Sequence, residues 1–322
     1  MTIDFEAALA AQRPALLRHC YRLMGSYAEA EDLAQDALER AWQARESYRA
    51  EAPFERWLYT IATNACLNAL ARRKRVLFLP QHRDEPAREL DFTKLEPAGF
   101  VTPAADAHLF PDPAEAAEGR EAVALAFVAL LQRVPPRQRA ALLLKDVLGW
   151  SAEEIGAALG LSLASVSSAL HRAREAVAGG QRRSEEPRPH TAAAFIRAWE
   201  ARDLAGLVAL LREDVELAMP PYQMWLRGVA DVSRLFQTER FAAFWAGALR
   251  VIPTRANGSP AYVFYRDGQL HSIMVVRFVD ERVAEMTVFI GPPYFAGFDL
   301  SATLVRTVSG SSTVMKGEGG SP

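Results

Sequence analysis

A chain of 322 residues in which half of the side chains are apolar is long enough for two or three domains, each with its own core. It contains no run of eighteen apolar residues, and its first residues lack the charged and apolar segments of a signal peptide, so we expect a cytoplasmic protein with no membrane partner. The net charge of −2 argues against a generic nucleic-acid binder, and Cys20 and Cys66, without a CxxC pair, predict buried thiols rather than a disulfide framework or a zinc site; we expect neither a metal nor a cofactor.

Basic side chains are concentrated in two separate parts of the sequence. Residues 1–80 hold 11 basic and 10 acidic side chains, and residues 121–183 hold 8 and 5. Between them, residues 81–120 hold 4 basic and 9 acidic side chains, and residues 184–322 hold 14 and 15. The two basic parts are therefore the candidates for contact with nucleic acid.

The first basic part, residues 1–80, contains the segment AEAEDLAQDALERAW at residues 28–42. Its apolar positions are spaced by threes and fours, as one face of a helix requires: Ala30, Leu33, Ala34, Ala37, Leu38, Ala41 and Trp42. The opposite face carries Glu31, Asp32, Gln35, Asp36 and Glu39. Taken alone, a face of this kind is most often a solvated helix surface.

A second amphipathic helix follows, with its apolar stripe at Phe54, Trp57, Leu58, Ile61, Ala65 and Ala69. Its polar side carries Thr60, Thr63, Asn64 and Asn68, and it ends in the cationic run Arg72, Arg73, Lys74 and Arg75. Amides can hydrogen-bond base edges, aromatic rings can stack on unpaired bases, and clustered arginines hold phosphates. This helix therefore suits binding to opened or single-stranded DNA.

The string from Ser26 to Arg75 resembles region 2 of the sigma-70 family in its extracytoplasmic-function (ECF) branch, where AEDLvQe…rAW and WLyrIATN.CLd.LRRRRR are the hallmarks. The resemblance implies that the acidic face, at Asp32, Gln35, Asp36 and Glu39, docks on the clamp helices of the largest subunit of core RNA polymerase. It also implies that helix 57–73 melts and captures the minus-ten promoter element through Trp57, Thr60, Asn64, Asn68, Arg72 and Arg73. Capture of a flipped base from a melted strand fits the two asparagines.

The acidic stretch QHRDEPARELDFTKLEPAGFVTPAADAHLFPDPAE has many prolines and no sustained periodicity. It predicts a flexible linker over residues 79–118, between a domain of residues 1–78 and a domain of residues 119–182.

The second basic part has the spacing of a helix-turn-helix. A helix over residues 121–133 is followed by one that begins at Pro135 and Pro136 and ends at Gly149. Ser151 and Glu154 form a capping box, Gly160 and Leu161 make the turn, and Ser162 caps the last helix, which buries Val166 and Leu170. A purely structural helix pair is the alternative.

This segment is similar to region 4 of the sigma-70 family, LPPRQR.vLlLrDvlg.S..EiA..Lg.S..tV.S.LhRAR, which implies that it reads the minus-thirty-five element. The candidates are Arg137, Ser165, Ser167, Ser168, His171 and Arg172, with Arg139 and Arg174 as further phosphate contacts. Ser167 and Ala169 stand where lysine and arginine are frequent, so cation contacts to guanine are reduced. We infer that region 2 and the polymerase share the affinity, and that this helix needs only modest base discrimination.

Residues 188–302 predict an α+β domain, and the tail 303–322 is expected to be disordered. A helix over residues 191–202 and the stretch DLAGLVALL precede a short strand at residues 215–219 and a helical stretch from Val229. Three strand-like runs follow: ALRVIPTRANG, PAYVFYRDG and LHSIMVVRFVDERVAEMTVFI. The last run alternates apolar and polar residues around the turn Asp280, Glu281 and Arg282, which predicts a hairpin.

This pattern resembles the SnoaL-like, nuclear-transport-factor-like domain that some ECF factors carry, and the strings LAMPPYQMWLRG and ANGSPAYVFYR resemble the SigG-like group. The implied fold class is two all-α sigma domains plus a C-terminal α+β cone domain. A cone of this type implies a pocket able to take a small-molecule ligand, with Tyr222, Trp225, Tyr262, His271 and Phe289 as candidates. The alternative is that the four aromatic residues belong to the core and that His271, at the start of a strand, has a structural role.

Two other functions are compatible with parts of the chain. Cone folds also host enzymes, and the residues available for acid–base chemistry would be Asp231, His271, Tyr222 and Tyr262, although the sequence does not fix their geometry. A ligand-responsive repressor would have no use for a polymerase-docking face. We therefore expect a sigma factor without catalytic residues, bound to core RNA polymerase and promoter DNA. Deletion of residues 190–322 is expected to change transcription several-fold, in a direction that the sequence leaves open.

Overall fold

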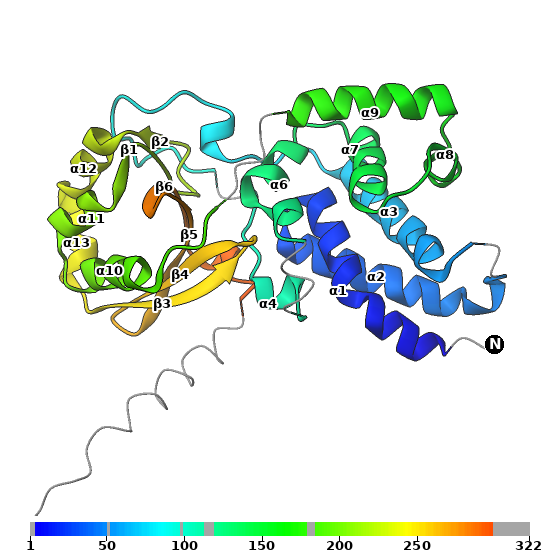
Figure 1. The fold of residues 1–322 in the computed structure, drawn as a ribbon, viewed down its shortest axis with the longest axis horizontal. Helices are drawn as coiled ribbons and strands as arrows, with labels where there is room; N and C mark the ends of the chain where they lie inside the picture. The colour runs from blue at the N-terminus through cyan, green and yellow to red at the C-terminus, as the bar shows by residue number, and fades with distance from the viewer. Residues whose placement is uncertain (1–3, 50–51, 97–98, 113–118, 179–183, 299–322) are drawn as a thin grey trace, which may run out of the picture.

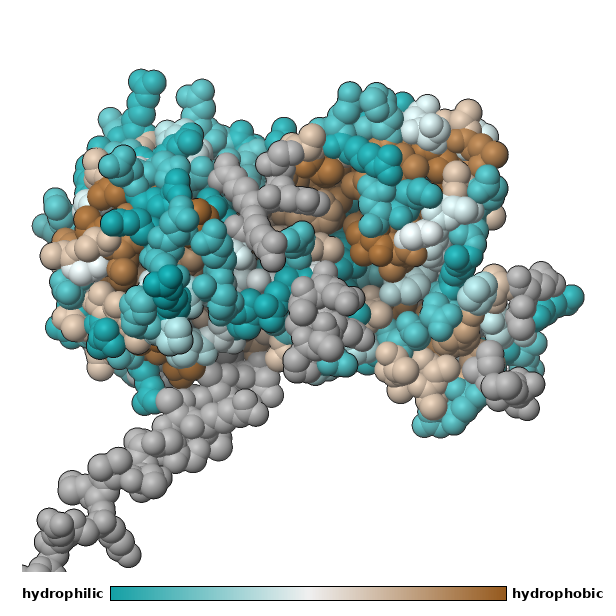
Figure 2. Space-filling model, viewed as in Figure 1, coloured by the Kyte–Doolittle hydropathy of each residue, from teal (hydrophilic) through white to brown (hydrophobic). Residues whose placement is uncertain are grey.

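Two groups of helices and one curved sheet make up the described part of the chain. The computed structural model describes residues 4–49, 52–96, 99–112, 119–178 and 184–298. Figure 1 shows the helical groups on one side and the sheet with its own helices on the other. On the face shown in Figure 2, hydrophilic residues cover most of both halves, and hydrophobic residues gather in smaller patches. The predicted tail, residues 303–322, lies outside the described residues.

The first helical group consists of α1 (Phe5–Met24), α2 (Tyr27–Gln43) and α3 (Phe54–Arg72), with a 3-10 turn, η1 (Arg45–Ser47), after α2. Asp4 and Ser26 accept backbone hydrogen bonds from the first turns of α1 and α2, and Gly25 ends α1 with a φ of 70°. Cys20 and Cys66 are buried free thiols in this core, as predicted.

Two residues of this group lie where the predicted helix faces do not put them. Trp42, assigned to the apolar stripe, is 44% exposed, because the buried position in the last turn of α2 is Ala41 and the next residue of a helix points about 100° away. Thr63, assigned to the polar side of α3, is buried, because its hydroxyl lies 2.8 Å from His19 Nε2 in the core. A buried threonine needs such a partner.

The segment after α3 was predicted to be flexible, but its described part packs against the sheet half. It contains a 3-10 turn, η2 (Pro80–His82), and the short helix α4 (Asp106–Leu109). The backbone N–H of Ala87 donates to Trp225 O at 2.8 Å, and that of Glu96 donates to Pro221 O at 2.9 Å. The prediction failed because these partners lie more than a hundred residues further along the chain.

The second helical group contains the predicted helix-turn-helix. Its elements are η3 (Glu121–Val123), α6 (Leu125–Leu131), α7 (Pro136–Leu142), the π-helical η4 (Leu143–Val147), α8 (Ala152–Leu159) and α9 (Leu163–Val177). The predicted helix 121–133 is interrupted at Ala124, whose ψ of 135° is extended. The Ser151–Glu154 capping box, the left-handed turn at Gly160 and the Ser162 cap are all present.

The residues from 184 to 298 that the structure describes form a six-stranded sheet with four helices. The helices are α10 (Pro189–Glu200), α11 (Leu204–Ala209), α12 (Val229–Phe236) and α13 (Glu239–Ala246). The strands are β1 (Leu211–Ala218), β2 (Trp225–Arg227), β3 (Leu249–Ala256), β4 (Ser259–Arg266), β5 (Gln269–Val279) and β6 (Arg282–Ile290), followed by η5 (Pro292–Tyr294).

The strand order is β2-β1-β6-β5-β4-β3, with β1 and β6 parallel and the other neighbours antiparallel. Asp280 and Glu281 have positive φ values of 51° and 60° and form the predicted turn between β5 and β6.

Both faces of this sheet are buried, and they belong to different cores. Alternate residues of a strand point to opposite faces, so Tyr262 and Phe264 pack with α10 to α13, whereas Val263 and Tyr265 join the core of the helical groups. Figure 1 shows the sheet between its own helices and the helical half. The cone domain is therefore joined to the helical groups by continuous apolar packing.

Candidate nucleic-acid interface and pocket

The acidic face of α2 is open to solvent, as the sequence predicts. Asp32, Gln35 and Glu39 are exposed, and the side chain of Asp36 is 46% exposed. Gln35 Nε2 donates to Glu39 Oε1 at 3.0 Å, and Arg40 pairs with Asp36 at 2.7 Å. These are one-turn contacts along the helix surface, which keep the face ordered while leaving it available to a partner.

On α3, the structure exposes part of the predicted DNA-binding set. Asn64, Asn68 and Arg72 are exposed along the helix. Trp57 is half-buried, because its ring packs against Phe5, Tyr48 and Phe54. Thr60, also half-buried, donates its hydroxyl to Arg56 O at 2.9 Å. The exposed side of α3 thus carries two amides and a guanidinium, and an aromatic cluster around Trp57 lies at the start of the helix.

Arg73 is not available for DNA in this arrangement, although the sequence assigned it to the minus-ten site. Its guanidinium donates to Met24 O at 2.8 Å and pairs with Glu29, and the side chain is only 13% exposed. The last carbonyls of a helix lack intrahelical partners and attract cations. Arg73 satisfies one of them at the end of α1.

On α9, all predicted outward residues are exposed: Ser165, Ser167, Ser168, His171 and Arg172. Arg137, at the start of α7, is exposed as well. Arg174 is held by a two-pronged ion pair to Asp146, at 2.6 and 3.0 Å. The outer face of α9 is therefore a neutral, hydroxyl-rich surface that becomes cationic only toward its C-terminal half.

Arg139, a predicted phosphate contact, is buried instead. Its guanidinium donates to Leu23 O at the end of α1, to the side-chain oxygen of Gln132 at 2.6 Å and to Val134 O at 3.1 Å. Burial, and then the charge of Arg73, lowers its pKa to about 9. Because Arg139 belongs to α7 and Leu23 to α1, this contact joins the two helical groups.

The two helical groups also meet directly, at α3 and α8. Arg56, in the first turn of α3, forms an ion pair with Glu154 of α8. α3 also packs on α7, which in turn packs on α9. The helices that carry the predicted minus-ten and minus-thirty-five surfaces, α3 and α9, are therefore connected through α7 and α8.

Asn257, which the sequence analysis did not single out, joins three parts of the chain. It lies fully buried at the tip of the β3–β4 hairpin. Its Nδ2 donates to Tyr21 OH in α1 and to Val123 O in η3, both at 2.8 Å. Its Oδ1 accepts from the N–H of Ala104 at 3.0 Å. The Asn-Gly pair signals a hairpin turn, but no local pattern reveals that the turn is inserted between distant helices.

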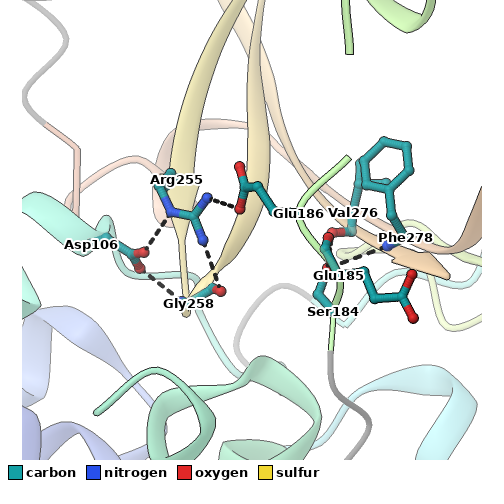
Figure 3. Close-up of polar contacts among 8 residues, drawn as sticks. All are labelled: Asp106, Ser184, Glu185, Glu186, Arg255, Gly258, Val276 and Phe278. Carbon is teal, nitrogen blue, oxygen red and sulfur yellow. Dashed lines mark hydrogen bonds and ion pairs between the residues drawn. The ribbon is translucent and has the colours of Figure 1, made fainter. Parts of the chain in front are cut away.

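A second polar contact lies beside this hairpin (Figure 3). Arg255 of β3 donates to Asp106 of α4 at 3.3 Å, pairs with Glu186 and donates to Gly258 O at 3.1 Å. Asp106 also accepts the N–H of Gly258 at 2.8 Å, and its burial raises the pKa of its carboxyl.

Figure 3 also shows the segment just before α10 alongside β5. Glu185 N–H donates to Phe278 O at 2.9 Å, and Phe278 N–H donates to Ser184 Oγ at 3.3 Å. The segment that leads into the sheet domain is therefore hydrogen-bonded to β5.

The cone holds a cavity of about 330 Å³, but the structure brings only part of the predicted pocket to it. Tyr222 and His271 line the cavity. Trp225 does not line the cavity, because its indole N–H donates to the backbone oxygen of Asp84, in the linker, at 2.9 Å. Tyr262 packs against Phe195 within the helix-facing core, and Phe289 faces the core of the helical groups. Phe289 alternates with Val288 and Ile290, which line the cavity, so it points to the opposite face of the sheet. Tyr262 shares the face of Phe264, and the sequence does not reveal that it packs on α10 instead.

The residues considered for acid–base chemistry are likewise separated. His271 and Tyr222 line the cavity, whereas Tyr262 lies in the core. Asp231 pairs with Arg234 on the surface of α12 at 3.1 Å. Among the described lining residues there is no carboxylate.

Two family models match this chain: Sigma-70 region 2 over residues 9–76, and Sigma-70, region 4 over residues 124–177. The ECF RNA polymerase sigma factor SigG of Mycobacterium tuberculosis is 38% identical over 322 residues, which cover 94% of this chain and 85% of the relative. This chain belongs to the ECF sigma factor family. Its function is that of an RNA polymerase sigma factor.

Further similarities to this sigma factor differ in how much of it they cover. The ECF RNA polymerase sigma factor SigE of Mycolicibacterium smegmatis is 35% identical over 160 residues, 49% of this chain and 54% of the relative. The crystal structure of the ECF sigma factor SigJ of Mycobacterium tuberculosis matches with a TM-score of 0.60 at 24% identity, over 91% of this chain and 99% of that one.

The SigJ match extends over both helical groups and the sheet, so it supports one fold for the whole described chain. The predicted fold class, two all-α sigma domains plus an α+β SnoaL-like cone, is confirmed. Within the described residues of this sigma factor, no helix combines the length and the apolar character that crossing a bilayer requires.

Proposed function

We propose that this sigma factor binds core RNA polymerase through the acidic face of α2, defined by Asp32, Gln35, Asp36 and Glu39. Their exposure supports this role, because a surface of one charge sign favours encounter with a cationic partner surface. We assign region 2 to residues 1–78, the linker to 79–118, region 4 to 119–182 and the regulatory cone to 188–302.

Promoter recognition is assigned to the same helices that the sequence singles out. α3 contacts the opened minus-ten element through Trp57, Thr60, Asn64, Asn68 and Arg72, and gains Arg73 once that side chain leaves the end of α1. α9, with Arg137 beside it, reads the minus-thirty-five element through Ser165, Ser167, Ser168, His171 and Arg172. The hydroxyl-rich face of α9 supports modest base discrimination, since it offers few charged donors to guanine.

The cone domain keeps the factor in a closed, inactive arrangement. The minus-ten and minus-thirty-five elements lie about 25 base pairs apart, which is roughly 85 Å of B-form DNA at 3.4 Å per base pair. In the closed arrangement Arg56 of α3 touches Glu154 of α8, and α3 itself is only about 28 Å long at 1.5 Å per residue. Because α8 packs on α9, α3 and α9 are too close to occupy both elements, so they must separate before initiation.

The observation that carries this proposal is the insertion of Asn257 between α1, the linker and η3. One side chain of the cone contacts each part that has to move apart. A tethered domain acts at a high effective concentration, so even weak contacts can hold the arrangement.

Transcription in vitro tests this regulation. At equal polymerase occupancy, the fragment 1–189 is expected to transcribe a cognate promoter several-fold more than the full chain. Full-length Asn257→Gly should act in the same direction, because glycine keeps the positive φ of 54° at that turn while removing the side chain. Asp280→Gly, at the exposed β5–β6 turn with a φ of 51°, is the matched control and should behave as the parent. Equal output from the parent, the fragment and Asn257→Gly would refute the closed arrangement as an inactive state.

A further inference from the structure

The cavity of the cone domain has the size and walls of a small-molecule site. Its volume of about 330 Å³ lies between the sheet and helices α12 and α13, and pockets that bind small ligands begin at about 300 Å³. Most of the lining is apolar or aromatic, including Phe236, Phe241, Phe264 and Met274. A ligand with a flat apolar body fits such walls.

The charged groups that line the cavity are cationic. Arg240 and Arg266 contribute to the lining, and no aspartate or glutamate does so among the described residues. Asp267 approaches Arg266 at 3.6 Å from outside the lining, with its side chain 60% exposed. His271 is held neutral, because burial and then the charge of Arg266 lower its pKa. One anionic group on the ligand would therefore meet complementary charge.

One wall of the cavity comes from the linker between the sigma regions. Phe92 lines the cavity and meets Tyr222 edge to face, with the ring centroids 5.5 Å apart. The guanidinium of Arg240 lies 4.8 Å from the centroid of Phe92 and donates to the hydroxyl of Tyr222. Gln223 N–H donates to Lys94 O at 3.2 Å, which fixes the next turn of the linker. The cavity is complete only when the linker lies on the cone.

We propose that this cavity binds a small monocarboxylic acid with an apolar, ring-containing body, and that the bound acid holds the linker against the cone through Phe92. In the closed arrangement the acid contacts both Phe92 and the rest of the cavity, so it binds this arrangement more tightly than one from which the linker has left. The difference between the two affinities sets how far the acid shifts the population toward the closed arrangement. The acid is thus a co-inhibitor of transcription, a consequence that rests on the proposed function.

Calorimetric titration of the full chain tests the site directly. The probes are 1-naphthylacetate and 2-(1-naphthyl)ethanol, which share the ring and chain and differ in the carboxylate. The acid is expected to bind at least tenfold more tightly than the alcohol. Arg240→Met, at an exposed position on the cavity rim, should reduce that preference below threefold while the alcohol still binds. Equal affinities for the two probes, or an unchanged preference in Arg240→Met, would overturn the assignment.

Two further variants locate the probe and test the linker. Met274→Trp, at a buried position of the lining, adds volume inside the cavity and should weaken both probes, whereas parental binding by this variant would place the site elsewhere. Trypsin cleavage after Lys94, whose side chain is 72% exposed, should slow several-fold with saturating acid in the parent and much less in Phe92→Ala. Binding without slower cleavage would overturn the linker step. Failure of the proposed function shows separately, as equal transcription by fragment and full chain, and leaves the probe affinities untouched.

Discussion

His19 lies buried between α1 and α3 and bears no charge there. Thr63 Oγ1 is 2.8 Å from its Nε2, and the ring of Tyr59 stands edge to face at 5.1 Å. Burial, with a smaller contribution from Arg22, lowers the pKa of His19 from 6.5 to about 3. In the unfolded chain His19 therefore binds a proton below pH 6.5, whereas in the folded state it stays neutral until the pH approaches 3.

The free energy of unfolding should consequently fall as the pH drops from 6.5 toward 3. For a pKa near 3 in the folded state, His19 accounts for a loss of about 2 kcal/mol between pH 7.5 and pH 5. His19→Gln, which can still hydrogen-bond Thr63, should remove this part of the pH dependence. Urea unfolding of parent and variant at both pH values measures it, and identical losses in the two proteins would contradict the role of His19.

A substitution of Asp36 tests the proposed polymerase-docking face at a single position. Asp36→Arg places positive charge within the acidic face and is expected to weaken binding to core RNA polymerase by tenfold or more. The new i,i+4 repulsion with Arg40 costs only about 0.5 kcal/mol, so the helix should persist. Glu239→Arg, the same charge change at an exposed position of α13, is the control. Pull-down at several salt concentrations decides, and equal retention of both variants would contradict the assignment.

Residue placement shows where sequence reasoning stops. The exposed face of α2 and the outward residues of α9 could be assigned from helical periodicity, because solvent lies on the far side of each stripe. Arg73 and Arg139 could not, because both cap the end of α1, and a carbonyl acceptor leaves no trace in the sequence around the arginine. The role of Asn257 could not be predicted either, because its hydrogen-bond partners lie far away in the sequence.

At the scale of elements, α9, the proposed recognition helix, has a neutral outer face. Ser162 caps it, Val166 and Ala173 bury its inner side, and Ser167 stands exposed. Such a helix makes few phosphate or guanine contacts of its own.

Adding one cation to this face should be measurable. Ser167→Arg is expected to raise the affinity of the full chain with core polymerase for promoter DNA, and to steepen the dependence of log affinity on log salt by about one. Fluorescence anisotropy across a salt series measures the slope. Glu121→Gln, at an exposed position of η3 outside the predicted DNA-contacting set, also raises the net charge by one and serves as the charge-matched control. A slope that Ser167→Arg leaves unchanged would mean that this face does not meet DNA.

Elements with local signals were predictable, and those fixed by distant pairing were not. The capping box of α8, the turn at Gly160 and the hairpin at Asp280 all carry their own sequence signature. The three-residue strand β2 has none, because it exists only through its pairing with β1. The packing of the linker on the cone depends in the same way on partners far along the chain.

At the scale of the whole molecule, the sheet shares one apolar core with the helical groups and encloses another with its own helices. The shared core is reinforced by Asn257 and by the Arg255–Asp106 pair. The central claim is that this packing keeps α3 and α8 together, and that initiation requires them to part.

A covalent cross-link between α3 and α8 tests that claim most directly. Arg56→Cys and Glu154→Cys are combined, joined by a short bismaleimide, and assayed for promoter-specific transcription with core polymerase. Cys20 and Cys66 are buried and should not react, and the two single variants treated identically are the controls. The account predicts that the joined protein loses at least nine-tenths of its transcription, while the untreated double variant and the treated single variants keep theirs. Parental transcription by the joined protein would contradict it.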